Sequence, residues 1–327
     1  MKILVIDVAA EHGGALTILN MFRKRFEEDT NNKYVFVLSN LHFEDTNNIK
    51  YFNCKWVKKS IFHRLWFDNI YIKKILESEK PDKIISLQNK AVAGGKIFQE
   101  VYFHNVLLIC ERQYRFSESK KLWLYQHPIA FLTKISLKKA NRIIVQAEWI
   151  KEELSTKWNI SSSRIEVQRP SITLDVEKME RLQIKGCPLF YPAPTAIYKN
   201  HITLIKACVN IWNEFGKNCG LTLSLTCNIN DLSRECLDII KADDYPISFL
   251  GRLSKDQLLD MYSKTILVFP SVLETVGLPL IEAAQFDSKI IVSDLKYSHE
   301  ALKDYENVTY FEPENVQALS ETIRKIL

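Results

Sequence analysis

The sequence lacks the short patterns that identify common cofactor and metal sites. It contains no Cys-x-x-Cys pair, no Gly-x-Gly-x-x-Gly loop and no Gly-x-x-x-x-Gly-Lys-Ser/Thr loop. These absences argue against a zinc site, nicotinamide or flavin binding in the usual style, and a P-loop. An Asp-x-Asp pair is also missing, and no group of His, Cys and Asp has the spacing of a metal site. We therefore expect no cofactor and no bound metal.

The cysteines and the apolar runs argue against a disulfide framework and a membrane-spanning segment. The seven cysteines are odd in number, which favours reduced, mostly buried thiols over a disulfide framework. No apolar run approaches the roughly 20 residues that span a bilayer, and the first residues lack the apolar core and cleavage site of a signal peptide. We expect a cytoplasmic protein, with peripheral contact at the inner face of the membrane as a further option.

What the sequence does have is length and an uneven charge. Its 327 residues, 46% of them hydrophobic, allow two domains with ordinary cores. Residues 1–168 carry a net charge of +9 and residues 169–327 a net charge of −4. Halves of opposite sign suggest two domains with different partners.

Apolar runs alternate with helical patterns throughout the chain. The run KILVIDVA at the N-terminus is typical of a strand that is buried on both faces, and Ser60 is placed to cap a helix that Pro81 stops after about Lys80. The alternation restarts at Leu189, after a stretch with mixed charges, Pro170 and Gly186. It predicts α/β domains with parallel, doubly wound sheets. We expect domains at 1–168 and 187–327, joined by a linker at 169–186.

The stretch SVLETVGLPLIEA carries the most distinctive pattern. Glu274 and Glu282 are separated by seven residues, and between them lie Gly277 and Pro279. Pro279 suits the first turn of a helix, and the free N–H groups of such a turn favour an anion. Two carboxylates beside an anion site suit a ligand with both phosphate and hydroxyls, such as a nucleotide sugar. A plain alternative is that Glu282 only favours a helix N-terminus.

Residues 249–295 resemble the donor-binding region of retaining glycosyltransferases of the two-domain GT-B fold, family 4. The family's mark is two glutamates separated by seven residues, preceded by Pro-Ser and containing Gly-Leu-Pro, and it stands here from Pro270 to Glu282. The resemblance implies two Rossmann-like domains facing across a cleft. The first would bind the acceptor and the second the donor. It makes the last helix, from about residue 316, a candidate to cross back onto the first domain.

The resemblance also implies roles for the residues of this motif. Glu274 would face the hydroxyls of the donor sugar, and Glu282 would hold the ribose of the nucleotide. The diphosphate would lie near the backbone N–H groups of the residues between them, which are Thr275, Val276, Gly277 and Leu278.

When the donor sugar is transferred, a diphosphate leaves it, and a cation is needed to neutralise the negative charge of that diphosphate. Lys199, after the first strand of the second domain, can neutralise that charge. The family usually has an Arg a few residues earlier, but Pro194, Thr195 and Ala196 occupy that region here. Arg252, in LGRLS at the next predicted strand end, is a candidate substitute. The alternative for both cations is a solvated loop side chain.

Two sites in the first half are weaker candidates. Gly13 and Gly14 follow the first strand, and the resemblance places a glycine pair there near the diphosphate or acceptor, although a tight turn explains them equally well. His104 ends a strand-like run, where the family often carries a His close to the reacting sugar. His12 and His127 rank below it, and His201 is interpreted as a helix-start residue.

Two basic, aromatic stretches of the first half suggest a surface partner. One includes Lys55, Lys58, Lys59, Arg64, Trp56 and Trp66, and the other includes Lys120, Lys121 and Trp123. Basic and aromatic side chains together suit an anionic membrane surface, and lipid-linked acceptors are frequent among bacterial enzymes of this type. Solvated surface is the plain alternative, and no known nucleic-acid motif appears.

We therefore expect a retaining glycosyltransferase that works without a metal. It would transfer a sugar from a nucleotide sugar to a hydroxyl of a glycan, lipid-linked in the favoured case, in the synthesis of a cell-surface polysaccharide such as O-antigen or capsule. Two alternatives remain open. The first is another GT-B activity, either a nucleotide-sugar epimerase or a phosphorylase. The second is a non-catalytic module that binds a glycan or nucleotide. This alternative stays open because the Arg that is usual in the family is missing.

Overall fold

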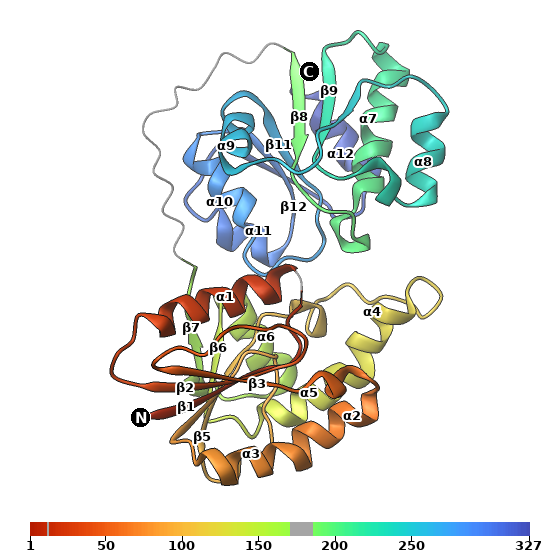
Figure 1. Ribbon diagram of the computed structural model, residues 1–327. Coiled ribbons are helices and arrows are strands. Elements are labelled where there is room, and N and C mark those ends of the chain that lie inside the picture. The colour runs from red at the N-terminus through yellow and green to blue at the C-terminus, as the bar shows by residue number, and fades with distance from the viewer. Residues whose placement is uncertain (12, 171–185) are drawn as a thin grey trace. The chain divides into compact units, whose positions relative to one another are not determined.

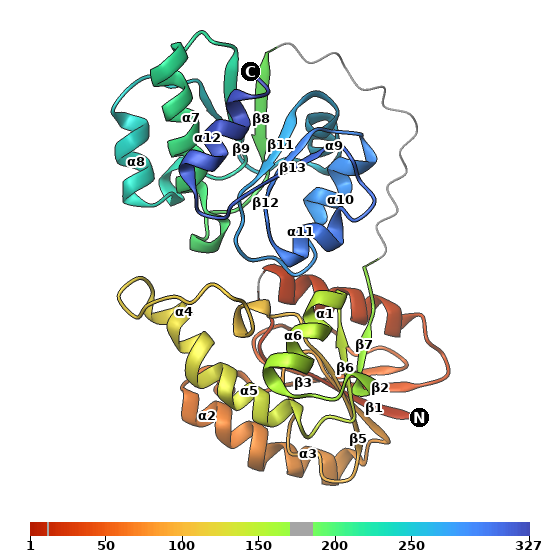
Figure 2. The ribbon, with the colours of Figure 1, turned by 180° about the vertical axis from the view of Figure 1, so that it is seen from behind.

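The computed structural model describes residues 1–11, 13–170 and 186–327, which form two units. Unit 1 extends from Met1 to Arg169 and unit 2 from Pro170 to Leu327. Each unit is a parallel β-sheet with helices on its faces (Figure 1; Figure 2). The expected α/β architecture with two Rossmann-like sheets is thus confirmed, while most of the expected linker lies outside the described residues.

Unit 1 has a seven-stranded sheet in the order β3-β2-β1-β4-β5-β6-β7. Its strands are β1 (Lys2–Asp7), β2 (Lys33–Leu38), β3 (Ile49–Asn53), β4 (Lys83–Ser86), β5 (Phe98–Tyr102), β6 (Arg142–Val145) and β7 (Ile165–Val167). Its helices are α1 (Gly13–Glu27), α2 (Ile61–Trp66), α3 (Ile72–Glu79), α4 (Lys120–Leu124), α5 (Ala130–Leu137) and α6 (Glu148–Trp158).

The two faces of β1 explain why this strand reads as a continuous apolar run. Ile3 and Val5 pack in the core under α1, whereas Leu4 and Ile6 pack in the core under α3 and the turn that precedes it. Because neighbouring side chains of a strand point to opposite faces, a strand covered on both faces needs apolar residues at every position.

A continuous helical segment joins α2 to α3 through a π-helical turn at Phe67–Tyr71. The Ser60 side chain accepts from the N–H of His63, and Lys80 ends the segment in the left-handed conformation. The start and the end predicted from Ser60 and Pro81 are both confirmed.

Unit 2 has a six-stranded sheet in the order β10-β9-β8-β11-β12-β13. Its strands are β8 (Cys187–Tyr191), β9 (Leu221–Leu225), β10 (Ile247–Phe249), β11 (Ile266–Phe269), β12 (Ile290–Ser293) and β13 (Val308–Phe311). Its helices are α7 (His201–Phe215), α8 (Arg234–Lys241), α9 (Lys255–Lys264), α10 (Leu278–Gln285), α11 (Lys296–Ala301) and α12 (Val316–Arg324).

The last helix, α12, packs against α7 inside unit 2 (Figure 1). Leu319 and Ile323 are buried, and the Ser320 hydroxyl contacts the Ala207 carbonyl at 3.4 Å. The apolar face of the helix is thus used within unit 2, and the expectation that the helix packs on the first domain stays a prediction.

The described residues lack two features that would mark a membrane-spanning or metal-binding protein. None of their helices is long and apolar enough to cross a membrane. Nor do they contain a group of three or more His, Cys, Asp and Glu side chains that could hold a metal ion.

Candidate functional site

The sheet order of unit 2 determines where a ligand can bind. The chain runs outward from β8 through β9 to β10 and then returns to the other side of β8 as β11. Such a reversal opens a crevice at the carboxyl ends of the two strands where it occurs. The loop 192–200 follows β8 and the loop 270–277 follows β11, so both predicted functional loops meet at this point.

An ion pair connects the two loops. The Lys199 ammonium group contacts Glu274 Oε1, and the two side chains are 14% and 15% exposed. The residues are 75 positions apart in the sequence. Lys199 and Glu274 were predicted as separate site residues, and the structure brings them into direct contact. The second oxygen, Glu274 Oε2, has no protein partner among the described residues.

Buried tyrosines hold the backbones of both loops in place. Tyr191 donates its hydroxyl hydrogen to the Lys199 carbonyl, and Tyr297 donates to the Ser271 carbonyl, each at 2.7 Å. Burial, followed by the nearby charge of Glu274, raises the pKa of both phenols well above the ordinary value. Both tyrosines therefore remain neutral donors, and the position of the ion pair depends on them.

Asn200 adds a third connection between the loops. Its amide donates to the Pro270 carbonyl at 3.2 Å and accepts from the Thr203 hydroxyl at 2.7 Å. Sequence reasoning missed Tyr191, Tyr297 and Asn200. Only Tyr191, at the end of a predicted strand, had a position that could have signalled a role.

Gly277 shapes the start of α10. It has a φ of +74°, and an added Cβ would lie 3.0 Å from Leu280 Cδ1 and 3.3 Å from Tyr297 Cδ2. A residue with a side chain would be both strained and crowded at this position. Gly277 is the N-cap residue and has no side chain to bond the first N–H groups of the helix. The backbone from Val276 to Leu278 thus keeps donors for a ligand.

Glu282 lies one turn into α10, as its spacing from Pro279 predicts. Its Oε2 accepts from the Tyr262 hydroxyl at 3.2 Å. Burial raises the pKa of Glu282, while the Tyr262 hydrogen bond and the charge of Lys255 act in the opposite direction. Contact with a further hydroxyl would favour the charged form, since it hydrogen-bonds the carboxylate.

Arg252 stands apart from the ion pair. It is exposed, follows β10 and makes no ion pair among the described residues. Because β9 lies between β10 and β8, the ends of β10 and β8 are about 10 Å apart. The structure does not bring Arg252 into contact with Lys199 or Glu274, so its role as the substitute cation stays a prediction.

The corresponding edge of unit 1 contains His104 and the predicted glycines. Gly13 and Gly14 are the first two residues of α1. His104 follows β5, and its ring lies 3.3 Å from Asn89 Nδ2 while its N–H donates to Asn89 Oδ1 at 2.7 Å. Burial lowers the pKa of His104 to about 4, so the ring is neutral at neutral pH.

The lower-ranked histidines have separate environments. His12 lies outside the described residues. His127 is exposed, and its ring stacks on Trp123 with the ring centres 4.6 Å apart. His201 starts α7, as expected from the sequence.

A charged network occupies the same edge at β1 and β4. Asp68 is buried, and its carboxylate contacts the Lys90 ammonium group and, at 3.0 Å, Arg64 Nε. Gln88 completes the network, since Arg64 Nη2 donates to its Oε1 at 2.7 Å and its Nε2 donates to Asp68 Oδ1 at 3.3 Å. At the end of β1, burial raises the pKa of Asp7 to about 7.

Comparisons with known proteins can now be set beside this geometry. Residues 189–327 match the family described as "Glycosyl transferases group 1". Over its full length the fold is that of the lipopolysaccharide outer core galactosyltransferase WaaB, with a TM-score of 0.67 at 17% identity, covering 100% of this chain and 91% of WaaB. The chain has a GT-B glycosyltransferase fold. The predicted resemblance is thereby confirmed, whereas retention and family 4 stay predictions.

Other relatives agree with this GT-B fold. WaaG, described as a glycosyltransferase involved in lipopolysaccharide biosynthesis, has a TM-score of 0.69 at 11% identity and covers 99% of this chain and 90% of WaaG. Anabaena HepE in complex with UDP-glucose has a TM-score of 0.66 at 14% identity, covering 99% and 89%. At such identities the likeness shows the fold alone.

One curated relative is similar in sequence. The O-antigen chain mannosyltransferase RfbU of Salmonella typhimurium (strain LT2) is 28% identical over 203 residues, which are 60% of this chain and 54% of the relative. The chain thus aligns with about half the length of this relative.

Proposed function

We propose that the protein is a retaining glycosyltransferase that moves a sugar from a nucleotide-sugar donor to a hydroxyl of a glycan acceptor. The contact between Lys199 and Glu274 carries this proposal. It places a cation and a carboxylate together at the crevice of a domain that matches group 1 glycosyl transferases. The solved complex of HepE with UDP-glucose supports a donor of this class.

Each side of the ion pair has a part in the reaction. The bond between the anomeric carbon and the diphosphate breaks with its electron pair going to the diphosphate. Lys199 and the N–H groups at the start of α10 neutralise that charge. The acceptor oxygen bonds to the same carbon, and the proton of its hydroxyl passes to the departing diphosphate oxygen. Glu274 Oε2 can accept a hydrogen bond from a hydroxyl of the sugar, so we propose that Glu274 orients the donor.

Glu282 suits the nucleotide end of the donor. It lies eight residues beyond Glu274 and one turn into α10, and Tyr262 donates to one of its oxygens. A ribose has neighbouring hydroxyls that can donate to the remaining lone pairs of a carboxylate. Because the proposed charge stabilisation comes from a side-chain cation and backbone dipoles, we propose that transfer needs no metal.

Unit 1 supplies the acceptor side in this proposal. The likeness to RfbU, an O-antigen chain mannosyltransferase, supports a glycan acceptor of a cell-surface polysaccharide. His104 has a neutral ring at the carboxyl end of β5, which suits contact with the reacting sugar or the acceptor.

A membrane surface is the proposed location of a lipid-linked acceptor. Helices α2 and α5 lie side by side in both views of unit 1 (Figure 1; Figure 2). Phe62 on α2 is 78% exposed and Phe131 on α5 is 63% exposed. Exposed lysines accompany them: Lys55, Lys59, Lys120 and Lys121. Exposed rings beside lysines suit insertion into an anionic interface, where each lysine contributes about 1 kcal/mol.

The structure shows that some side chains of the two basic, aromatic stretches pack inward or form ion pairs. Arg64 turns inward to Asp68 and Gln88 and does not belong to the exposed surface. Trp56 is half-buried against Trp66 and Tyr71, with ring centres 5.1 and 5.0 Å away. Lys58 contacts Glu11 at 2.7 Å. Sequence alone could not separate Arg64 and Trp56 from their exposed neighbours.

Donor binding and product analysis test the enzymatic proposal. A thermal-shift series with nucleoside diphosphates and nucleotide sugars should raise the melting temperature for one base, since a ligand of the native state stabilises it. Mass spectrometry of an incubation with the matching nucleotide sugar and a glycan should show a new glycoside. An isomerised donor would identify an epimerase, and a sugar phosphate would identify a phosphorylase. Binding without any product or slow donor hydrolysis would identify a non-catalytic module.

Sedimentation with vesicles tests the membrane proposal. Binding should require anionic lipid, weaken with added salt and weaken further in Phe62→Ser and Lys59→Glu. Lys303→Glu, an exposed substitution in unit 2, is the matched control and should leave sedimentation unchanged. Equal binding to neutral and anionic vesicles would contradict the proposal.

A further inference from the structure

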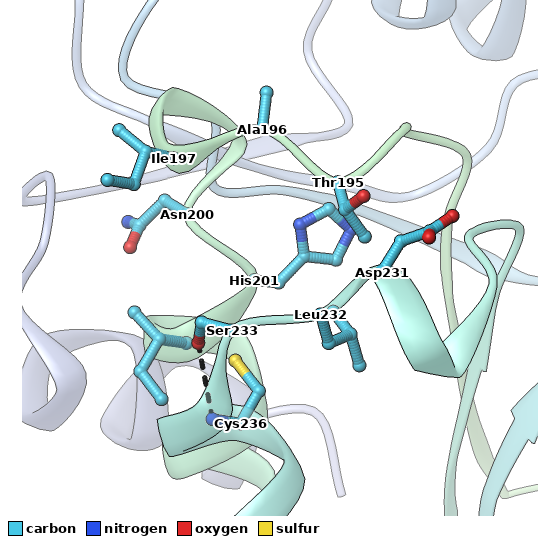
Figure 3. Close-up of a pocket in the computed structure, with 10 residues that line it drawn as sticks. Thr195, Ala196, Ile197, Asn200, His201, Asp231, Leu232, Ser233 and Cys236 are labelled. Atoms are coloured by element: carbon cyan, nitrogen blue, oxygen red, sulfur yellow. Dashed lines mark hydrogen bonds between the residues drawn. The ribbon is translucent and has the colours of Figure 1, made fainter. Parts of the chain in front are cut away.

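A second concave site lies beside the start of α7. It is a pocket of about 230 Å³ between the loop after β8 and the segment before α8 (Figure 3). Neither Lys199 nor Glu274 lines it. The pocket is therefore separate from the residues that the proposed function assigns to the donor.

His201 is the most informative residue of this pocket. It is 5% exposed, and its Nε2 is a buried atom without a hydrogen-bond partner among the residues that the structure describes. Figure 3 shows the ring directed toward Thr195 and Asp231, which also line the pocket. A buried nitrogen without a hydrogen bond destabilises the folded protein. A ligand that donates a hydrogen bond to this nitrogen offsets that cost, which favours binding.

The second ring nitrogen decides what kind of group Nε2 can bind. A hydrogen bond with the Ala193 backbone raises the pKa of His201, although burial outweighs it and lowers the pKa to about 4. A bond that favours the protonated ring is one in which the ring donates to a carbonyl. Because Nε2 has no partner, the donor is Nδ1, and the neutral ring presents the lone pair of Nε2 to the pocket.

Asp231 and Ser233 add acceptor oxygens to the pocket. The Asp231 carboxylate has no ion-pair partner among the residues that the structure describes. The Ser233 hydroxyl accepts from the N–H of Cys236 at 3.3 Å. An anion is disfavoured by Asp231 and by the lone pair of Nε2, although the start of a helix alone would attract one.

The remaining lining is apolar. Ile197, Ile202 and Leu232 contribute side chains to the same pocket. A ligand that fits must present hydrogen-bond donors on one side and carbon-bound hydrogens on another. The hydroxyls and the ring carbons of a neutral sugar meet both requirements.

We propose that this pocket binds one neutral sugar unit of a glycan, with a sugar hydroxyl donating to His201 Nε2. The unit belongs to the glycan and not to the nucleotide donor, since the pocket excludes the donor residues. The source of the sugar rests on the proposed function, while the chemistry of recognition rests on the pocket itself.

Nitrogen-detected NMR of the histidine rings tests the proposal directly. Protein with ¹⁵N-labelled histidine should show His201 as the Nδ1–H tautomer, and the spectrum of His201→Gln assigns its signals. Titration with the methyl glycosides of glucose, galactose and mannose should shift the His201 Nε2 signal saturably for at least one of them. A signal that no glycoside moves, or that only inorganic phosphate moves, would overturn the proposal.

Variants separate the pocket from its surroundings. Ala196→Phe places a ring at the pocket lining and should abolish the shift, whereas Ala242→Phe, on an exposed residue at the end of α8, should leave it intact. Asp231→Asn should weaken glycoside binding several-fold without altering the fold. An unchanged titration in both pocket variants would contradict the proposal.

The experiments distinguish a failure of the pocket inference from a failure of the proposed function. Nucleoside diphosphate binding is measured on the same samples by thermal shift. Diphosphate binding and transfer without glycoside binding would overturn only the pocket inference. A saturable glycoside shift in a protein that transfers no sugar would overturn only the proposed function.

Discussion

The two units place charge at the same topological point and use it differently. In each sheet the chain reverses beside a central strand, at β1 and β4 in unit 1 and at β8 and β11 in unit 2. In unit 1 the charges there satisfy one another, since Asp68 contacts both Arg64 and Lys90. In unit 2 a single ion pair leaves one carboxylate oxygen and the start of a helix available.

The difference separates support from binding. A network in which each donor already has an acceptor rigidifies the edge of a sheet but has little capacity left for a ligand. In unit 2, buried tyrosines bond the backbone of the two loops that carry the ion pair. The free carboxylate oxygen of the pair can therefore bond a ligand. Loss of a charge should therefore damage stability in unit 1 and damage turnover in unit 2.

The largest effect is expected for Asp68→Asn in unit 1. Removing the carboxylate charge leaves Arg64 and Lys90 partly buried without a counter-charge, which should cost about 3 kcal/mol of unfolding free energy. Denaturant unfolding measures this cost. Asp260→Asn, at an exposed pair with Lys264, is the matched control and should cost about 0–1 kcal/mol. Equal losses in the two variants would remove the distinction between the units.

The second effect concerns Lys199→Ala in unit 2. Turnover should fall on the order of 10²-fold, because one stabiliser of the leaving diphosphate is lost. Lys206→Ala, at the exposed pair with Glu235 on the same side of the unit, should leave turnover unchanged. Added chelator should not reduce the activity of the wild type. A strict requirement for a divalent metal would contradict the proposed charge stabilisation.

The two glutamates should differ in kind. Glu274→Ala should reduce turnover strongly, while Glu282→Ala should mainly weaken binding of the free nucleoside diphosphate, by roughly 10-fold for one lost charged hydrogen bond. Steady-state kinetics and calorimetry with the diphosphate separate these effects. Small and similar losses in both variants would argue against the assignment of sugar to Glu274 and ribose to Glu282.

The last effect is a shared acid sensitivity, with one histidine in each unit. Burial lowers the pKa of His104 and of His201 from 6.5 to about 4. Below pH 6.5 the unfolded state therefore binds protons that the folded state does not, so stability is present above 6.5 and is lost as the pH falls toward 4. Melting temperatures between pH 7 and 4 should fall less steeply in His104→Gln and His201→Gln. Parallel curves for wild type and variants would contradict both shifts.

Local patterns were enough to predict the elements and several of their ends. The apolar run of β1, the Ser60 cap and the arrangement of Gly277 and Pro279 at α10 each depend on neighbours within a few residues. The spacing of Glu274 and Glu282 likewise identified one wall of the candidate site, because a loop and the helix that follows it are continuous in sequence.

Tertiary structure decided which of these residues meet. Lys199 reaches Glu274 across 75 positions only because β11 returns to lie beside β8, and no local signal encodes that neighbour. The same holds for Tyr297 at Ser271, for Arg64 turning inward to Asp68, and for the buried ring of His201. Sequence determines propensity and periodicity, which act along the chain. Contacts between loops depend on strand order and burial, which arise only when the sheet is assembled.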